Sequence, residues 1–351
     1  MRRLGILFII CAMLLCGGCQ GSIYSNYRDV ERLQPVQTLG IDVQSGSVCV
    51  AVAAGEGQGE GIPAVLRQSA ESVETALVQL QNAFPEAQPY YAHVQYILFG
   101  SQAAEQGMGQ WLEWIERSPK MRLDALAFIV RGEAGDLILS AATQGGGTAE
   151  KLESLDFELR TLGEGMAVSV RSLASALAQE GTGLCGAIRC ADESGSIRFD
   201  DSASIQPAGF AVFRDGALCT FIEQQYAPAV LLLLGQPQGA RIPLDDGVTM
   251  RLGSGRTRVS FDGATAHIAC EVEAVIVEAA DMTDVDALGE RLGAQLAGQI
   301  ERVMALEASL GCDFLGLLDG RSPEALAMDV SVDVHAEHSY GLRPQEGGQT
   351  R

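Results

Sequence analysis

The chain has 351 residues, of which 47% are hydrophobic and 20% are charged, so it is long enough for two or three domains with apolar cores. Its formal net charge is -21 at pH 7, and no stretch gathers lysine and arginine into a basic stripe. Binding to nucleic acid and broad adsorption to anionic lipid both reward clustered lysine and arginine, so the composition argues against both.

The first residues predict an export signal. Arg2 and Arg3 precede an apolar run over residues 4–15, and two glycines then precede Cys19. A run of about twelve apolar residues spans roughly 18 Å as a helix, well short of the ~30 Å hydrocarbon core of a bilayer. A cysteine in this position is where bacterial lipoprotein processing cleaves, and the thiol is then diacylated. We therefore expect residues 1–18 to be a lipoprotein signal peptide and Cys19 to be the lipid attachment site; simple secretion and an uncleaved anchor are the alternatives.

Residues 19–34 are polar with charges of both signs, and we expect them to form the lipid anchor and tether. A β-hairpin is predicted next, with strands over 36–43 and 47–54 joined by a glycine-containing turn. The glycine-rich stretch 55–61 has neither dinucleotide-fold spacing nor a following lysine, so we expect an exposed loop without nucleotide. A helix over 69–84 is predicted, because apolar residues recur there at helical spacing.

Buried strands and helices then alternate up to about residue 180, which predicts a mixed α/β layer built on a central sheet. We expect strands over 94–100 and 125–130, and helices over 102–116, 133–142, 149–162 and 168–179.

Beyond Cys190 the pattern predicts hairpins, at 205–222 and 257–278, together with a short buried helix over 229–235. One apolar stripe over 283–310, ending at Gly311, predicts the longest helix, and 328–336 alternates as a closing strand. The fold class predicted is therefore α+β and multi-domain, with mixed β-sheets and packed helices. We expect an N-terminal domain over 35–200, a C-terminal domain over 203–341 with an antiparallel sheet and one long helix, and a polar tail over 342–351.

No pattern predicts a catalytic residue, a cofactor or a metal site. His335 and His338 lie three apart on a strand and so face opposite sides, while His93 and His267 stand alone. The acidic pair at 245–246 precedes a glycine, as in a solvated turn. The chain is therefore not expected to be an enzyme.

The remaining cysteines are expected to behave mainly as small hydrophobic residues, because Cys49, Cys219 and Cys270 lie inside strand-like runs. Only Cys185 and Cys190 are close in sequence. Across a short hairpin they could form a disulfide, but they have no second pair with which to complete a zinc site.

An ordered series of stretches resembles the Ger(x)C, or GerAC-like, family of spore germination lipoproteins. In the first half the series comprises Cys19, residues 26–33 leading to 36–42, residues 93–100 followed by Ala103, Ala104 and Gly107, and then 117–119, Arg122 and the strand to Val130. In the second half it comprises 209–213, 216–218, Glu223 and the Asp-x-x-Gly of 312–316. The resemblance therefore extends over almost the whole chain in the right order.

The resemblance implies a non-enzymatic C subunit of a nutrient germinant receptor. Such a subunit is attached through diacylglyceryl-cysteine to the outer face of the spore inner membrane, and it acts with two integral-membrane partner subunits in nutrient-triggered germination. The main alternative is a solute-binding lipoprotein of a transporter, which would share the anchor but have two repeated parallel α/β lobes. A cell-envelope hydrolase is a more distant alternative. Which residues contact a ligand stays open at this point.

Overall fold

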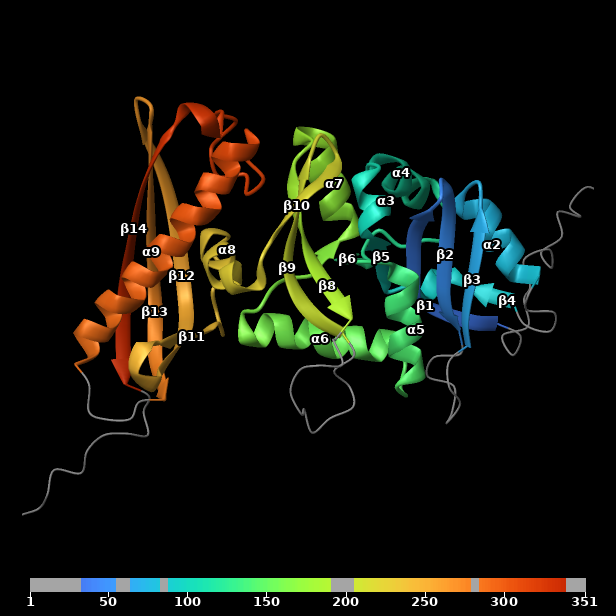
Figure 1. The fold of residues 1–351 in the computed structure, drawn as a ribbon, viewed down its shortest axis with the longest axis horizontal. Helices are drawn as coiled ribbons and strands as arrows, with labels where there is room; N and C mark the ends of the chain where they lie inside the picture. The colour runs from blue at the N-terminus through green and yellow to red at the C-terminus, as the bar shows by residue number, and fades with distance from the viewer. Residues whose placement is uncertain (1–32, 55–63, 83–87, 191–204, 279–283, 339–351) are drawn as a thin grey trace, which may run out of the picture.

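The computed structural model describes residues 33–54, 64–82, 88–190, 205–278 and 284–338 (Figure 1). Within these residues the strands form two sheets, one of ten strands and one of four. No helix of the described part is long and apolar enough to cross a bilayer. The predicted α+β, multi-domain class is confirmed.

The large sheet has the order β10-β9-β8-β6-β5-β1-β2-β3, with β4 beside β1 and β7 beside β6. β1, β5, β6 and β8 run parallel to one another, and the hairpin partners are antiparallel. Its strands are β1 (Leu33–Gln44), β2 (Ser47–Ala54), β3 (Ala64–Ala70), β4 (Gln88–Tyr90), β5 (Tyr96–Gly100), β6 (Leu126–Val130), β7 (Val168–Ser169), β8 (Gly183–Cys190), β9 (Ile205–Arg214) and β10 (Ala217–Ile222).

Helices cover both faces of the large sheet (Figure 1). One face packs against α2 (Val73–Asn82), α3 (Ser101–Glu105), α4 (Gly109–Arg117) and α7 (Val170–Glu180). The other face packs against α5 (Ala134–Thr143) and α6 (Thr148–Leu162). Along β5, Ile97 and Phe99 enter the first core while Tyr96 and Leu98 enter the second. Because both faces are covered, the strands read as continuous apolar runs.

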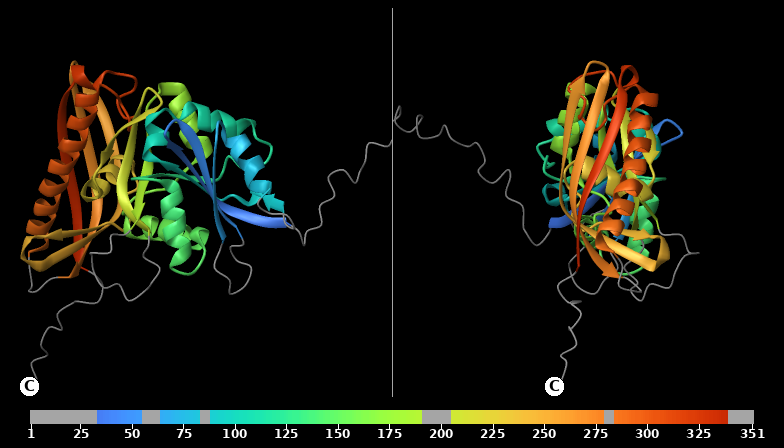
Figure 2. Two further views of the ribbon diagram at one scale, coloured as in Figure 1. Left: turned by 45° about the vertical axis from the view of Figure 1, so that its right-hand side comes forward. Right: turned by 90° about the vertical axis from the view of Figure 1, so that its left-hand side faces the viewer.

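The small sheet has the order β11-β12-β13-β14, with strands β11 (Arg241–Leu244), β12 (Val248–Asp262), β13 (Thr265–Glu278) and β14 (Ala327–His338). The antiparallel sheet that we expected here is instead mixed. β11, β12 and β13 are antiparallel, but β14 runs parallel to β13, because the long helix α9 (Val285–Leu310) connects the two strands and returns the chain to the start of β13. One face packs against α8 (Ala227–Leu233) and α9, and the outer face is exposed. Figure 2 shows this sheet at one end of the molecule.

The ends of the long helix agree with its sequence pattern. The Asp284 carboxylate accepts hydrogen bonds from the backbone N–H groups of Asp286 and Ala287, and Gly311 ends α9 in the left-handed conformation at φ 65°. A 3-10 turn, η3 (Gln224–Tyr226), leads into α8, the predicted buried helix. Two further 3-10 turns, η4 (Asp245–Gly247) and η5 (Pro323–Ala325), flank the small sheet, and η2 (Tyr91–His93) precedes β5.

Three predicted elements differ from the structure. The helix expected over 102–116 is two helices, α3 and α4, because Gly107 has φ 107° and the Met108 N–H donates to the Gly216 carbonyl instead of to the helix. The helix expected from 69 begins at Val73, since residues 64–70 form β3 on the edge of the large sheet. The hairpin β9–β10 pairs with β8, so the large sheet continues past residues 201–202, where we placed a domain boundary. The domain bounds themselves stay a prediction.

Candidate functional site

Several predicted features lie outside the described residues, among them the signal peptide over 1–18, most of the tether over 19–34 and the polar tail over 342–351. Cys19 precedes Leu33, the first described residue, so lipid attachment at Cys19 stays a prediction. The glycine-rich stretch 55–61 falls in the interval between β2 and β3.

The four histidines are dispersed. His93 is exposed beside the Tyr90 ring, with ring centroids 5.1 Å apart. His267 Nδ1 lies 2.7 Å from Asp329 Oδ2 on the outer face of the small sheet, and His335 of β14 lies on the same face. His338 is the last residue of β14. Across the described residues, no group of three or more histidines, cysteines or carboxylates could hold a metal ion.

Cys185 and Cys190 do not flank a turn, so the hairpin that we expected between them is wrong. Both lie on β8, five positions apart, and their side chains therefore point to opposite faces of the sheet. The Cys185 thiol donates to the Ala127 carbonyl at 3.3 Å, and burial raises its pKa to about 12. Cys185 is thus an unreactive core residue.

Polar side chains gather where the parallel strands of the large sheet end. Asp42, near the end of β1, is 2% exposed, and its carboxylate accepts hydrogen bonds from the backbone N–H groups of Ala134 at 2.7 Å and Gly135 at 2.8 Å. These amides begin α5. A side chain at Gly100, the last residue of β5, would overlap Asp42 Oδ1. The Gly-Ile-Asp and Phe-Gly stretches of the resemblance therefore meet at one buried carboxylate.

This arrangement fills a position that open α/β sheets often use for ligands. A helix N-terminus at the carboxyl edge of parallel strands attracts phosphate and other anions. Here the Asp42 carboxylate already occupies the start of α5. Burial raises the pKa of Asp42, and the amide hydrogen bonds from Gly135 and Ala134 oppose part of that rise. The sequence signal that could have located this contact is an aspartate at the end of a buried strand.

Arg131, directly after β6, joins this edge to the end of β10. Its Nη1 donates to both carboxylate oxygens of Glu223, at 3.0 Å and 3.3 Å, and its guanidinium carbon lies 4.5 Å from the centre of the Phe221 ring. Glu223 belongs to the second half of the series of family-like stretches. Because Arg131 directly follows the strand to Val130, which ends the first half of the series, the contact brings the two halves close together in space.

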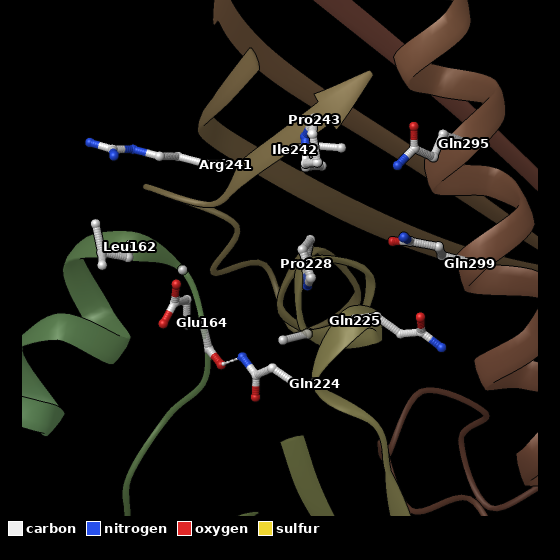
Figure 3. A pocket seen from close by; sticks show the side chains of 12 residues that line it. Leu162, Glu164, Gln224, Gln225, Pro228, Arg241, Ile242, Pro243, Gln295 and Gln299 are labelled. Carbon is white, nitrogen blue, oxygen red and sulfur yellow. Dashed lines mark hydrogen bonds between the residues drawn. The ribbon is translucent and has the colours of Figure 1, made fainter. Parts of the chain in front are cut away.

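A cleft of about 480 Å³ lies where the end of α6 approaches α8, β11 and α9 (Figure 3). Its apolar part comes from Leu162, Pro228, Ile242 and Pro243. Its polar side chains are Glu164, Gln224, Gln225, Arg241, Gln295 and Gln299. No serine, cysteine, histidine or lysine is among these lining residues, all of which belong to the described chain, so its groups are suited to binding and not to nucleophilic chemistry.

Two glutamines show how the cleft is built. Gln224 is structural, because its Nε2 donates to the Glu164 carbonyl at 2.6 Å and its Oε1 accepts from the Gly209 N–H at 2.7 Å. Gln299 Oε1 is buried and has no hydrogen-bond partner among the described residues, and Figure 3 shows its amide directed toward Pro228. One side chain of the cleft lining thus keeps a buried acceptor without a partner among the described residues. Gln295 and Gln299 lie four residues apart on α9, a spacing that sequence analysis could have noticed.

Close backbone contacts at two glycines join the end of α6 to the segment before β11, on either side of the cleft. Gly163 ends α6 at φ 59°, and Gly239 has φ 93°. A side chain at Gly163 would overlap the Ala240 backbone, and one at Gly239 would overlap the Thr161 carbonyl. Because only glycine permits this approach, the walls are preformed.

A buried carboxyl group, that of Glu307, lies near the place where the loop after α9 contacts the large sheet. Glu307 of α9 is 0% exposed, and its Oε1 accepts from the Leu315 N–H at 2.9 Å. Burial, reinforced by the nearby Asp313 carboxylate, raises the pKa of Glu307 to about 8. Asp313 itself accepts from the N–H groups of Leu317 and Leu318, which explains the Asp-x-x-Gly stretch as a turn.

The loop that follows α9 contacts the strands of the large sheet. The Thr182 hydroxyl, just before β8, donates to the Asp313 carbonyl at 3.2 Å, and Arg214 Nη1, at the end of β9, donates to the Leu310 carbonyl at 3.0 Å. The Glu307 cluster therefore lies beside the contact between the two sheets.

Comparison with known proteins gives a consistent result. Residues 26–188 match the family model described as the spore germination protein N-terminal domain. No curated protein matches the chain. Among solved structures, the crystal structure of the GerBC protein is similar with a TM-score of 0.53 and 14% sequence identity, over 86% of this chain and 96% of that chain. At that identity the likeness concerns the fold. Residues 26–188 thus carry the N-terminal domain of the Ger(x)C, or GerAC-like, spore germination proteins, and the chain as a whole has a fold like that of the GerBC protein.

Proposed function

We propose that this chain is the lipid-anchored, non-enzymatic C subunit of a spore nutrient germinant receptor. In this proposal it acts with two integral-membrane partner subunits at the outer face of the spore inner membrane. The observation that carries the proposal is the match of residues 26–188 to the spore germination N-terminal domain. The lining of the cleft supports a binding role, because it provides amide groups above an apolar surface.

The proposed anchor is a diacylglyceryl group on Cys19. It carries two acyl chains, which suffice for stable attachment to a membrane, whereas one chain does not. Leu33, where β1 begins, lies fourteen positions after Cys19. A fully extended chain of that length spans at most roughly 50 Å, so the start of β1 would stay within that distance of the lipid surface.

The anchor is tested by Cys19→Ala, with Cys16→Leu as a matched control. Cys16→Leu restores the leucine that is usual three positions before a lipidated cysteine, so this variant should be processed and lipidated like the wild type. Cys19→Ala should lose incorporation of a labelled fatty acid and leave the membrane fraction or keep its leader. A Cys19→Ala chain that still incorporates the label and supports normal germination would contradict the proposal.

The solute-binding alternative requires two repeated parallel lobes. In this chain β11, β12 and β13 are antiparallel, and only β13–β14 is a parallel pair in the small sheet. Titration calorimetry with amino acids and sugars separates the two functions, since tight binding by the isolated chain would favour a transporter component.

A further inference from the structure

β14 ends the small sheet with an unpaired edge. It pairs with β13 over all twelve of its residues, from Ala327 opposite Thr265 to His338 opposite Ile276. Within the described residues no strand lies on its other side. A strand of this length therefore presents a row of backbone N–H and C=O groups that another extended chain could pair with.

The inward side chains of β14 are less covered than those of its neighbour. On β13 the inward residues are 0–3% exposed: Ala266, Ile268, Cys270, Val272, Ala274 and Ile276. On β14 the corresponding residues are all only partly buried: Met328, Val330, Val332, Val334 and Ala336. α9 approaches them from one side, where Gly293 lies against the Val332 carbonyl. A row of partly exposed apolar side chains thus follows the unpaired edge, as expected for a strand that could take another strand beside it.

The outward side chains of β14 make this edge acidic. Asp329, Asp333 and Glu337 alternate with Ser331 and His335 and point away from the core. Asp329 contacts His267. Among the ion pairs between described residues, no lysine or arginine contacts Asp333 or Glu337.

Two arginines of this face pair with a carboxylate in the middle of the sheet. Arg256 and Arg258 of β12 both pair with Glu271 of β13, so they neutralise the middle of the sheet and leave its β14 edge negative. A second copy of the chain is disfavoured as the occupant, because β14 beside β14 would place acidic rows against each other, and like charges on facing strands repel.

We propose that the open edge of β14 is a docking site for an extended basic segment of another protein, which adds a strand to the small sheet. Apolar residues of that segment would cover the row from Met328 to Ala336, and its alternate lysines or arginines would lie beside Asp333 and Glu337. Backbone pairing supplies affinity, and the alternating side chains supply selectivity. This inference stands independently of the receptor assignment.

The test uses the full chain in detergent micelles and twelve-residue peptide probes. One probe alternates valine with lysine, a second alternates valine with glutamate, and a third has the lysine and valine residues of the first in blocks. Hydrogen exchange should slow at β14 with the first probe, which should bind about tenfold more tightly than the other two. Light scattering should show that the chain remains monomeric.

Charge reversal gives the matched comparison. Asp333→Lys with Glu337→Lys should invert the preference, so that the valine–glutamate peptide binds more tightly. Glu105→Lys with Glu116→Lys makes the same charge change at exposed positions of α3 and α4 and should leave the preference unchanged.

Three results would overturn the proposal. The first is no change in exchange at β14 with the valine–lysine peptide, and the second is the same peptide preference in the Asp333→Lys/Glu337→Lys variant. The third is protection of β14 without peptide, either through a dimer or through a contact that disappears when residues 342–351 are deleted, since the occupant would then be a second copy or the chain's own tail.

Discussion

The two sheets differ in how many of their faces are buried. The large sheet is covered by helices on both faces, so β2 and β5 are buried at nearly every position. The small sheet has helices on one face only, so along β13 buried residues alternate with residues that are partly or fully exposed. Continuous apolar runs and strict alternation are therefore the local signatures of the two kinds of layer.

The two sheets also differ in how their polar side chains are satisfied. In the large sheet a polar group must be satisfied internally, as Asp42 is by the two amides of α5. In the small sheet the outer face accepts charges at little cost, as with Glu271 and its two arginines. The first layer is thus suited to holding a scaffold, and the second can present a charged surface.

The largest expected difference in stability is between two single variants, each of which introduces one glutamate into one of the sheets. Ala127 of β6 is 0% exposed, whereas Ala269 of β13 is exposed and lies opposite Arg258. Ala127→Glu buries an unpaired carboxylate and should cost about 4 kcal/mol or more, or prevent folding. Ala269→Glu should change the free energy of unfolding by less than about 0.5 kcal/mol. Urea denaturation measures both, and equal losses would contradict the contrast between the sheets.

A smaller effect is expected at the carboxyl edge of the large sheet. Asp42→Ala removes two hydrogen bonds to a buried carboxylate and leaves the amides of Ala134 and Gly135 without partners, which should cost about 3 kcal/mol. The control is Asp136→Ala, because Asp136 is 61% exposed and pairs with Arg67 at the surface. That pair should contribute less than about 1 kcal/mol. If both variants had the same denaturation midpoint, Asp42 would not hold α5 in place.

The third prediction concerns pH. Burial raises the pKa of Glu307 from 4.5 to about 8, so the folded chain holds this proton more tightly than the unfolded chain does. The stabilising contribution of protonated Glu307 is fully present below pH 4.5 and is lost as pH rises toward 8. Glu307→Gln should remove this loss, so its stability relative to wild type should increase between pH 5 and pH 8, by up to about 1.4 kcal/mol per pH unit.

Glu301→Gln is the control for that measurement, since Glu301 is exposed on the same helix. It should follow the wild type across the whole pH range. A Glu307→Gln variant whose stability runs parallel to that of the wild type would show that Glu307 is ionised at neutral pH in the folded chain.

Much of the fold could be predicted because its signals are local. The hairpin β1–β2 follows from a glycine-containing turn between apolar runs, and α9 follows from its stripe and Gly311. β3 could not be recognised in the same way, since this edge strand holds three polar residues in a row, Arg67, Gln68 and Ser69, and shows no alternating apolar pattern. The pairing of β9 with β8 joins segments on either side of residues 191–204, and such register has no local signal.

The site was less accessible to prediction than the fold. Asp42 and the amides of α5 are 92 and 93 residues apart in sequence, so their contact depends on the sheet order. Glu307 did leave a signal, because it occupies a position on the apolar stripe of α9 between Val303 and Leu310. The cleft takes its walls from segments around residues 163, 228, 242 and 299, and no periodicity in any one segment indicates it.

The central claim is that this chain is the C subunit of a membrane receptor, and affinity capture from spore inner membranes tests it most directly. The chain, tagged after Arg351 and solubilised in mild detergent, should bring two polytopic membrane subunits with it in constant ratio, and Cys19→Ala should reduce their recovery. Recovery of the chain alone, or with a transporter permease and its ATPase, would contradict the account.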